Sequence, residues 1–500
     1  MNYAFKNFDG TLKDKVVDWR LNGDISKLDI MTSVNYNQKT LLEFKNKISN
    51  LKGKKVLLIG DYDCDGITAT YIMRKLLLKL DISVNYYIPS RFKDGYGINE
   101  AMVDMAYDNH FDVIITLDNG IVAYKPIDKA LALGIDVLIV DHHEYECLPK
   151  VSAILHGSLL EEGYKNLCTA GLACLLYHSF FEDDKVLAYA SIATLADMVE
   201  VFGYNRYLLK KGLNILNTQE IYTINALSLK SHNYSYDDLS YHVIPKINAV
   251  SRLNGNANKV VAYLDMDQEE ASKMALEINN INNKRKDIGQ MMKEKAMAYH
   301  IGHNVLVSYD TSYEEGLCGL VAGQMMNQEA LPSLVFALKD GLLKGSGRAP
   351  EGINLYDILK PYKSHFKSFG GHEAAVGLSL TIDEIDGLLE YLETIELNNV
   401  NKEVLVVNSG DLQYEDYLKL KELEPFGTGF KEPLFALMNP DIKSFFKIKG
   451  KYPKFVLNNN LEAISFNKMN PIAFNGLIGR VTSNSFHTNS LTFMVDDFLE

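Results

Sequence analysis

The sequence predicts an α/β protein with a parallel sheet, a long connecting helix, a second α/β unit and a small β domain. Short apolar runs alternate with helix-like stretches from Lys55 to Val140, which is typical of a parallel sheet with helices on both faces. Apolar residues then recur with helical spacing from Asp267 to His300. The last part of the chain is rich in short strand-like segments. A chain of 500 residues that is 47% apolar has room for about three domains with buried cores.

The elements follow one another in a regular order. Residues 1–50 look helical and polar, and we expect them to form an N-terminal cap. Short apolar runs predict buried strands at 55–60, 82–88, 112–116 and 135–140. Helices are expected between these strands at 66–80, 98–109 and 124–133, and further helices within 167–217. The second α/β unit begins at NVLVSYD, and the β domain has one helix signal near 415–422.

Composition and charge exclude several classes of protein. The chain has no run of about 18 apolar residues and no apolar segment at its start, so we expect neither a membrane span nor a secretory signal. The net charge of −13 argues against a broadly basic surface but permits a local basic groove. The cysteines are odd in number and form no CxxC pair, which fits reduced thiols in the cytoplasm: Cys64, Cys147, Cys168, Cys174 and Cys318.

An alternating acidic motif follows the first predicted strand. Asp61, Asp63 and Asp65 stand at the carboxyl end of a buried strand, where they repel one another unless a cation binds them. The pattern D-x-D-x-D-G also begins an EF-hand loop. That loop needs a Glu at its twelfth position, which is Ile72 in this sequence, and a helix where a strand is expected. A solvated acidic turn is the second alternative.

Acids and histidines also follow two other predicted strands. Asp118 follows the strand at 112–116, and Asp141, His142 and His143 follow the strand at 135–140. Parallel sheets place their ligands at the carboxyl ends of the strands, so we expect these side chains to meet. Mixed carboxylate and imidazole donors suit manganese or magnesium. Asp197, alone in SIATLADMVE, is either a helix cap or a fourth carboxylate for the metals.

No competing motif for a nucleotide or a protease is present. The sequence contains no G-x-x-x-x-G-K-[ST], no G-x-G-x-x-G after a strand and no H-E-x-x-H.

Polar and basic stretches outside this sheet edge could bind an anion. PKINAVSRLNG, residues 245–255, contains Lys246 and Arg252. We interpret the charged middle turn of the long helix as a solvated face: Asn282, Lys284, Arg285 and Lys286.

Two glycine-rich stretches lie in the second α/β unit. Residues 345–348, Gly-Ser-Gly-Arg, predict a flexible loop whose donors suit a phosphate. Gly370 and Gly371 before His372 permit close backbone approach to a ligand. Glycine turns are common, so neither stretch specifies a site by itself.

The β domain contains KSFFKIKGKYPKF, in which lysines alternate with aromatic residues. Two interpretations remain open. Cations and stacking rings track a single nucleic-acid strand without sequence preference. Lysines also protect the exposed edge strand of a hairpin.

Taken together, these motifs resemble a known family. DYDCDG, TLDNG, DHH and the isolated Asp197 resemble, in order and spacing, the four motifs of the DHH phosphoesterase superfamily. GSGRAP and FGGHEAAVG resemble its companion DHH-associated domain. PKINAVSRL, the N-x-x-R at Asn282 to Arg285 and LEPFGTGFKEPLF narrow the resemblance to the RecJ family of single-stranded-DNA-specific exonucleases.

The resemblance implies a domain plan. After the cap at 1–50 it places a DHH phosphoesterase domain at 51–262, a connecting helix at 263–300, a DHH-associated domain at 301–397 and an OB-fold-like nucleic-acid-binding domain at 398–500.

The resemblance also implies a set of site residues. Two divalent ions, Mn²⁺ or Mg²⁺, are expected on Asp61, Asp63, Asp65, Asp118, His142 and Asp197, with His143 completing the catalytic set and Asp141 supporting the histidines. Phosphate or nucleic-acid binding is expected at Arg91 near the 5′ end, and at Arg252, Ser346, Arg348, Gly371 and His372. Tracking of a single strand is expected at Phe445, Lys447, Lys449, Lys451 and Tyr452.

The sequence departs from the family pattern at several positions. Cys64 stands where Ala is usual, and Lys246 where Arg is common. Ile59 occupies a position that is His in many relatives, so we expect Asp61 to carry more of the metal ligation. We also expect this chain to have no long C-terminal extension of the kind found in the family.

The resemblance therefore implies a two-metal exonuclease that hydrolyses single-stranded DNA from 5′ to 3′ and releases mononucleotides in DNA repair and recombination. It implies a cytoplasmic monomer with no membrane contact, and a single-strand-binding protein or a helicase as protein partner. Two other functions stay open. A small-substrate DHH phosphoesterase would act on oligonucleotides or nucleotide phosphates, but the β domain argues against it. A non-catalytic single-strand binder would not need the intact acidic and histidine set.

Overall fold

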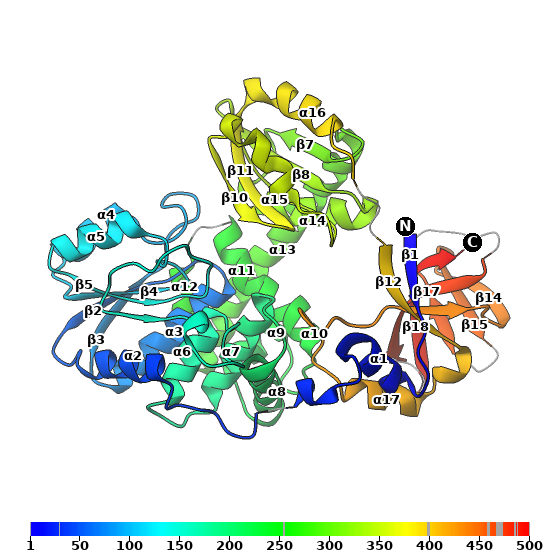
Figure 1. Ribbon diagram of the computed structural model, residues 1–500, viewed down its shortest axis with the longest axis horizontal. Helices are drawn as coiled ribbons and strands as arrows, with labels where there is room; N and C mark the ends of the chain where they lie inside the picture. Colours follow the sequence, from blue (N-terminus) through cyan, green and yellow to red (C-terminus); the bar gives the residue numbers. More distant parts are fainter. Residues whose placement is uncertain are drawn as a thin grey trace. The chain divides into compact units, whose positions relative to one another are not determined.

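The computed structural model of the protein describes residues 2–29, 31–253, 256–397, 401–457, 461–466, 474–484, 487 and 489–499. Its contacts divide the chain into two compact units. The small unit comprises Met1–Met31, Glu200–Arg206 and Asn401–Glu500, and the large unit comprises Thr32–Val199 and Tyr207–Val400. Figure 1 shows the elements of both. Among the described helices, none is long and apolar enough to cross a bilayer.

The first sheet of the large unit is parallel throughout, which confirms the prediction from the alternating pattern. Its order is β3-β2-β4-β5-β6, and each neighbouring pair runs parallel. The strands are β2 (Lys55–Ile59), β3 (Ser83–Tyr87), β4 (Val113–Leu117), β5 (Asp136–Val140) and β6 (Ala153–Leu155). β6 is an addition to the predicted strands, because a run of three residues does not stand out in a sequence.

Helices cover both faces of this sheet (Figure 1). α4 (Glu100–Asp108) and α5 (Tyr124–Ala132) pack on one face, in a core with Leu57, Ile114 and Ile139. α3 (Cys64–Lys79) and α6 (Thr169–His178) pack against each other on the opposite face. The helices predicted between the strands are therefore confirmed.

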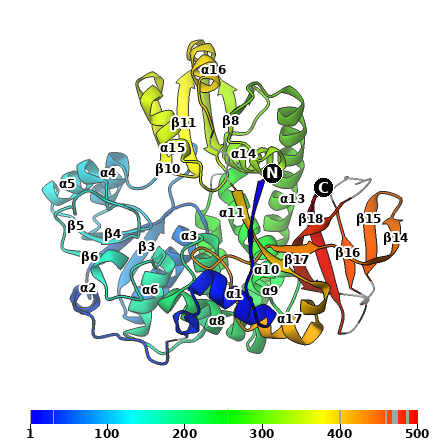
Figure 2. The same cartoon turned by 45° about the vertical axis from the view of Figure 1, so that its right-hand side comes forward.

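The remaining helices of this half of the chain lead to one long helix. They are α2 (Lys39–Ser49), α7 (Lys185–Ala196), α8 (Gly203–Thr218), α9 (Tyr222–Ser228), α10 (Tyr236–Asp238), α11 (Ile244–Leu253) and α12 (Asn258–Tyr263). α13 (Gln268–Tyr299) spans 32 residues, which confirms the predicted connecting helix. Asp267 caps its start by accepting the Glu270 N–H. In Figures 1 and 2 α13 runs beside α11, against which it packs.

The second sheet of the large unit is mixed. Its order is β10-β11-β9-β8-β7, with only β7 and β8 parallel. The strands are β7 (Leu306–Asp310), β8 (Ser333–Lys339), β9 (Leu342–Arg348), β10 (Ser368–His372) and β11 (Ala375–Thr381). α14 (Cys318–Glu329) packs with α13 on one face, and α15 (Leu355–Leu359) and α16 (Ile385–Glu393) pack on the other.

The predicted phosphate loop is instead the end of strand β9. Residues 345–348 pair with β8 on one side and β11 on the other. A Cβ on Gly345 would lie 2.2 Å from the Val335 carbonyl oxygen, and one on Gly347 would lie 2.5 Å from Leu334 Cδ2. The glycines are therefore needed because neighbouring strands approach closely, and the expectation of a flexible loop was wrong.

The small unit contains an eight-stranded mixed sheet of order β1-β12-β13-β17-β18-β16-β15-β14. Its strands are β1 (Asn2–Lys6), β12 (Asn401–Val407), β13 (Phe435–Met438), β14 (Ile442–Ile448), β15 (Tyr452–Leu457), β16 (Glu462–Ile464), β17 (Gly476–Ser483) and β18 (Leu491–Leu499). Its main helices are α1 (Leu12–Leu21) and α17 (Tyr414–Lys421), the second where a helix was predicted. The predicted start of this domain at residue 398 lies outside the described residues.

The N-terminal residues do not form the separate cap that their polar pattern suggests. β1 pairs in parallel with β12, so residues 1–31 complete the small unit, whereas α2 belongs to the large unit. The reason is a strand pairing between segments far apart in the sequence, which local pattern does not reveal.

Candidate metal centre and anion site

Two aspartates after β2 accept hydrogen bonds at the starts of helices. Asp63 is the N-cap of α3, and its carboxylate accepts the N–H groups of Asp65 (3.0 Å) and Gly66 (3.1 Å). The Asp65 carboxylate accepts the N–H groups of Thr169 (2.7 Å) and Ala170 (2.8 Å) at the start of α6. Helix amino termini carry unpaired donors and the positive end of the helix dipole, so both carboxylates are held there.

Asp61 occupies a tight place beside α3. A Cβ on Gly66 would lie 2.6 Å from the backbone nitrogen of Asp61, so only glycine permits this approach. Asp61 is 3% exposed, and its Oδ1 has no hydrogen-bond partner among the described residues. A buried carboxylate oxygen without a donor is unfavourable unless a cation binds it.

Asp118 ends strand β4 in an unusual backbone conformation. Its φ is +65°, in the left-handed region, and such strain is concentrated at functional sites. The Thr169 hydroxyl donates to its carboxylate (3.0 Å), and the Tyr96 hydroxyl donates to its carbonyl (2.9 Å). These bonds fix the Asp118 side chain toward the start of α6.

Asp141 orients the two histidines. Its Oδ1 accepts the N–H groups of His142 (2.8 Å) and His143 (3.2 Å) and lies 2.8 Å from His143 Nδ1. Its Oδ2 accepts the N–H of Ile121 (3.0 Å). The carboxylate therefore sets the direction of the His143 ring, whose Nε2 lies 3.2 Å from the Tyr96 hydroxyl.

Side chains from four segments of the chain lie close together. His142 Nε2 lies 3.3 Å from Asp118 Oδ1 and 3.5 Å from Asp197 Oδ2. Asp197 is the C-cap residue of α7, so it both ends a helix and presents its carboxylate to the cluster. Three overlapping groups have ligand atoms within 4.8 Å of one another: Asp118–His142–His143, Asp65–His142–Asp197 and Asp61–Asp63–Asp118.

The carboxylates of this cluster are difficult to ionise in the absence of a cation. Burial, then the charges of Asp63 and Asp118, raise the pKa of Asp61 well above its usual value. Burial, then Asp118 and Asp197, raise the pKa of Asp65 in the same way. Burial and Asp118 raise the pKa of Asp63 to about 6, and burial raises that of Asp197 to about 7.

The pKa of His142 is raised, so its positive charge partly balances the negative charges of the aspartates. Burial lowers its pKa, but the hydrogen bond that the ring donates to Asp118 and the charge of Asp197 outweigh burial and raise the pKa to about 10. In the absence of a metal, a proton on His142 thus supplies positive charge to the cluster. Its oxygen and imidazole donors fit a divalent ion such as Mn²⁺ or Mg²⁺.

A cluster of arginines lies next to the acidic cluster: Arg91, Arg252, Arg285 and Arg348. Burial, then the charges of the other three, lower the pKa of Arg252 to about 10. Among the described residues, none of the four forms an ion pair with a carboxylate. The charge of Arg91 lowers the pKa of Asp61, and the charge of Asp63 raises the pKa of Arg252. Neighbouring guanidinium groups that form no ion pair with a carboxylate suit an anion such as phosphate.

The middle turn of α13 is not the fully solvated face that we predicted. Asn282 is 2% exposed, and burial lowers the pKa of Arg285. Lys284 and Lys286 are exposed, as expected. The helical pattern of α13 does not reveal that α11, which carries Arg252, covers this turn.

Ser346 and Arg348 lie on β9 next to the start of α14. A Cβ on Gly319, in the first turn of α14, would lie 3.0 Å from Arg348 Nη2 and 3.4 Å from Ser346 Oγ. The Arg348 Nη1 donates to the Gly347 carbonyl (2.7 Å). Glycine at 319 therefore leaves room for the guanidinium beside the first turn of α14.

The structure does not join Gly371 and His372 to this site. Both are exposed on β10, the edge strand of the second sheet. Among the described residues, no hydrogen bond, ion pair or ring contact links His372 to the acidic cluster. Gly371 has a φ of +139°, and a Cβ there would lie 2.3 Å from the Ala375 carbonyl oxygen, so the hairpin itself requires glycine.

The predicted tracking residues lie on a hairpin at the edge of the small unit. β14 is the last strand of the sheet, and Phe445 is 51% exposed on it. Lys447 is on β14, Lys449 and Lys451 are in the turn, and Tyr452 begins β15. The hairpin is an edge, so both interpretations of its lysines, strand tracking and edge protection, stay open.

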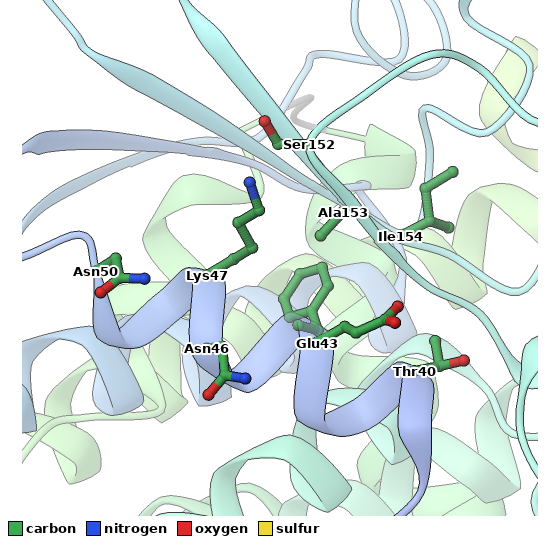
Figure 3. A pocket seen from close by; sticks show the side chains of 9 residues that line it. Thr40, Glu43, Asn46, Lys47, Asn50, Ser152, Ala153 and Ile154 are labelled. Atoms are coloured by element: carbon green, nitrogen blue, oxygen red, sulfur yellow. The ribbon is translucent and has the colours of Figure 1, made fainter.

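A groove elsewhere in the large unit contains none of the predicted site residues. It lies between α2 and the edge strand β6, and is lined by Thr40, Glu43, Phe44, Lys47 and Ala153, among others (Figure 3).

Two residues of the site were missed in the sequence. Thr169 binds Asp65 through its N–H and Asp118 through its hydroxyl. Tyr96 binds the Asp118 carbonyl, and its ring contacts that of His143 edge to face at 5.7 Å. Only their positions in the sequence could have indicated a role. Thr169 stands at the start of a helix, and Tyr96 lies between two glycines.

Three family models match the chain in sequence. The DHH family, N-terminal domain, matches residues 55–199, the DHHA1 domain residues 302–396 and the RecJ OB domain residues 405–497. The chain therefore contains a DHH domain, a DHHA1 domain and a RecJ OB domain. This series of domains confirms the fold class predicted from the motifs, with an OB domain after two α/β domains.

Two of the similar curated proteins share one name. The single-stranded-DNA-specific exonuclease RecJ of Bacillus subtilis is 30% identical over 447 residues, which are 83% of this chain and 56% of that protein. The protein of the same name from Escherichia coli is 28% identical, over 77% of this chain and 75% of the relative. The chain therefore spans little more than half the length of the Bacillus relative.

Solved structures agree with this fold. RecJ from Thermus thermophilus in complex with Mn²⁺ superimposes with a TM-score of 0.86 at 22% identity, covering 100% of this chain and 80% of that chain. An exonuclease RecJ bound to manganese matches with a TM-score of 0.63 at 25% identity, covering 72% of this chain and 95% of that one.

Proposed function

We propose that the chain is a metal-dependent exonuclease that hydrolyses single-stranded DNA from its 5′ end and releases mononucleotides, in DNA repair and recombination. The observation that carries this proposal is the carboxylate–histidine cluster beside four arginines that form no ion pair with a described carboxylate. The names of the relatives, single-stranded-DNA-specific exonucleases, support the substrate.

The acidic cluster would hold two divalent ions, Mn²⁺ or Mg²⁺. Bound divalent ions neutralise charge on the scissile phosphate and acidify a water that can attack it. Asp118 and His142 each belong to two of the three ligand groups, so we assign them central places in the cluster. Asp61 and Asp63 would hold one ion together with Asp118, and Asp65 and Asp197 would hold the other together with His142. His143, held by Asp141, completes the catalytic set.

The chemistry would need no covalent intermediate. Cys64 and Cys168 lie close to the aspartates, but both are buried, and burial followed by the nearby carboxylates raises the pKa of each thiol well above its usual value. Thiols that stay protonated are poor nucleophiles. Hydrolysis by water is therefore the proposed reaction.

The arginine cluster would give the cleavage its direction. A terminal phosphate monoester carries about 1.5 to 2 negative charges at pH 7, whereas an internal diester carries about one. Unpaired guanidinium groups therefore favour the phosphorylated end of a strand. Arg91, Arg252 and Arg348, with Ser346, are assigned to this phosphate, and Arg285 joins them.

End-labelled DNA tests the proposal. Single-stranded DNA labelled at the 5′ phosphate should release its label as a mononucleotide from the first turnover, whereas a 3′ label should remain on shortening strands. Duplex DNA should resist, and chelation of the metal should stop the reaction. Faster hydrolysis of a dinucleotide than of long single strands would favour the small-substrate phosphoesterase. Metal-dependent binding without hydrolysis would favour the non-catalytic binder.

An arginine variant tests the direction of cleavage. Arg348→Ala should reduce the preference for a 5′-phosphorylated over a 5′-hydroxyl strand by about tenfold or more, since a charge-assisted hydrogen bond is lost. The Mn²⁺ content should not change. Lys344→Ala, on the exposed part of the same strand, is the matched control and should behave as the wild type. An unchanged end preference in Arg348→Ala would remove this arginine from the phosphate site.

A further inference from the structure

His156 lies at the same edge of the parallel sheet as the acidic cluster. It directly follows β6, the strand that pairs with β5, and the Leu155 carbonyl accepts the N–H of Asp141 (3.2 Å). The side chain is 5% exposed. β6 thus brings a buried histidine against the turn that carries His142 and His143.

Hydrogen bonds at both ring nitrogens determine which nitrogen of His156 carries the proton. Nδ1 accepts the backbone N–H of Ser158 (3.1 Å) and lies 2.8 Å from the Ser158 hydroxyl. Nε2 must therefore carry the proton, and it donates to the backbone carbonyl of His143 (3.0 Å). The Tyr145 ring packs edge to face on the imidazole at 5.1 Å, and its hydroxyl bonds to the Ser158 hydroxyl at 2.9 Å.

The turn after β5 is therefore held from two sides. Asp141 binds the N–H groups of His142 and His143, and His156 binds the carbonyl of His143. A donor on that carbonyl restricts the rotation of the peptide that follows His143. Residues behind metal ligands commonly set affinity by fixing the ligands before the ion arrives.

We propose that His156 is a positioning residue, which fixes the His142–His143 turn through the His143 carbonyl and so strengthens metal binding without touching the ion. The inference rests on the proposed metal site. It makes β6 part of the metal centre, although no predicted ligand comes from that strand.

Two substitutions of similar size separate this role from simple packing. His156→Gln keeps a side-chain N–H near the position of Nε2, whereas His156→Met fills the space without a donor. The full chain is loaded with Mn²⁺ alone, and the dissociation constant is measured by calorimetry and by electron paramagnetic resonance of the free ion. Thermal unfolding of each metal-free variant shows that it is folded.

We expect His156→Met to weaken Mn²⁺ binding about 10- to 100-fold, and His156→Gln to remain close to the wild type, as for other residues behind metal ligands. His178→Met is the control. His178 is half-buried and, like His156, lies close to a backbone carbonyl, that of Asp183 (3.2 Å), but at the far end of α6. Its variant should lose stability without losing Mn²⁺ affinity.

The outcomes distinguish this inference from the proposed function. No Mn²⁺ binding by the wild-type chain would overturn the proposed function itself. Normal Mn²⁺ binding by both the wild type and a folded His156→Met would overturn only the positioning role. Equal loss of affinity in His156→Met and His178→Met would mean general loosening of the unit, which also overturns the role.

Discussion

Asp118 combines three features that are individually uncommon. Its backbone is in the left-handed region, its carboxylate is 3% exposed and accepts a buried hydroxyl, and its oxygens lie within reach of two different ligand groups. A strained residue persists only when its surroundings determine it, and here a helix start and a tyrosine do so. The conformation directs the carboxylate into the cluster that would hold the metal ions.

Asp118→Ala should abolish hydrolysis while single-stranded DNA still binds within several-fold of the wild type. Loss of a ligand in the metal cluster should remove several kcal/mol of transition-state stabilisation, which is about a hundredfold or more in rate. The measurement is rate and affinity on one substrate. Asp112→Ala, at the opposite end of β4, is the control and should keep its rate. A rate above about a tenth of the wild type would remove Asp118 from the metal site.

The affinity for Mn²⁺ should rise with pH. In the metal-free protein the pKa of Asp197 is about 7 and that of His142 about 10. At pH 7 the His142 side chain therefore holds a proton, and Asp197 holds one in about half of the molecules. A metal must displace these protons, and raising the pH removes this competition. Calorimetry between about pH 6 and 9, in buffers of different ionisation enthalpy, should show proton release on binding. Affinity that is constant across this range would contradict the assignment of both ligands.

At the scale of elements, helix starts and close backbone approaches build the site. Asp63 caps the start of α3, Asp65 accepts the N–H groups at the start of α6, and Gly66 allows Asp61 to lie against α3. The strand–helix order and the acids at strand ends were predictable, because apolar runs and motif spacing are local properties. The β9 strand and the buried turn of α13 were not, because their neighbours come from other parts of the chain.

Gly66→Ala should disrupt the metal site, because the new methyl group would lie 2.6 Å from the backbone of Asp61. We expect a destabilised protein that binds Mn²⁺ poorly. Gly289→Ala, within α13 where a Cβ meets nothing within 4 Å, is the matched control. It should stabilise the chain by about 0.5–1 kcal/mol, as removal of a glycine from a helix interior does. Chemical denaturation and Mn²⁺ titration measure both. Equal behaviour of the two variants would mean that Asp61 does not need its close contact with α3.

At the scale of the whole molecule, three segments build the small unit. Besides β1, it includes Glu200–Arg206, whose buried Arg206 donates to the carbonyls of Leu28 (2.7 Å), Leu423 (2.9 Å) and Glu424 (3.0 Å). The OB domain was predictable from its strands and its LEPFGTGF motif. The contribution of residues 1–31 and 200–206 was not, because a charged residue in a helical stretch gives no sign of burial. Deletion of the C-terminal residues would therefore expose β1 and Arg206, so substitutions are the better test of this unit.

The lysines of the β14–β15 hairpin should bind long single strands. Lys443, Lys447 and Lys449 have no ion pair with a described carboxylate, and Phe445 and Phe446 are exposed beside them. Replacing the three lysines by Ala in the full chain removes charges that would displace counter-ions from the phosphates. The plot of log affinity for single strands against log salt should become less steep, its negative slope shrinking in magnitude by about 2. Affinity at low salt should fall by tenfold or more. A dinucleotide offers too few phosphates to gain from the hairpin, so its hydrolysis should change little.

The control for this experiment matches the loss of charge. Lys6, Lys13 and Lys419 belong to the same unit, but each forms an ion pair, with Glu403, Glu422 and Asp416 respectively. Replacing these three by Ala gives the chain the same net charge as the hairpin variant. Binding of a long strand at two salt concentrations should then separate local contact from overall charge. If both triple variants bind the long strand equally well, the hairpin lysines only protect an edge strand, because their phosphate contacts would have lowered the salt slope in one variant alone.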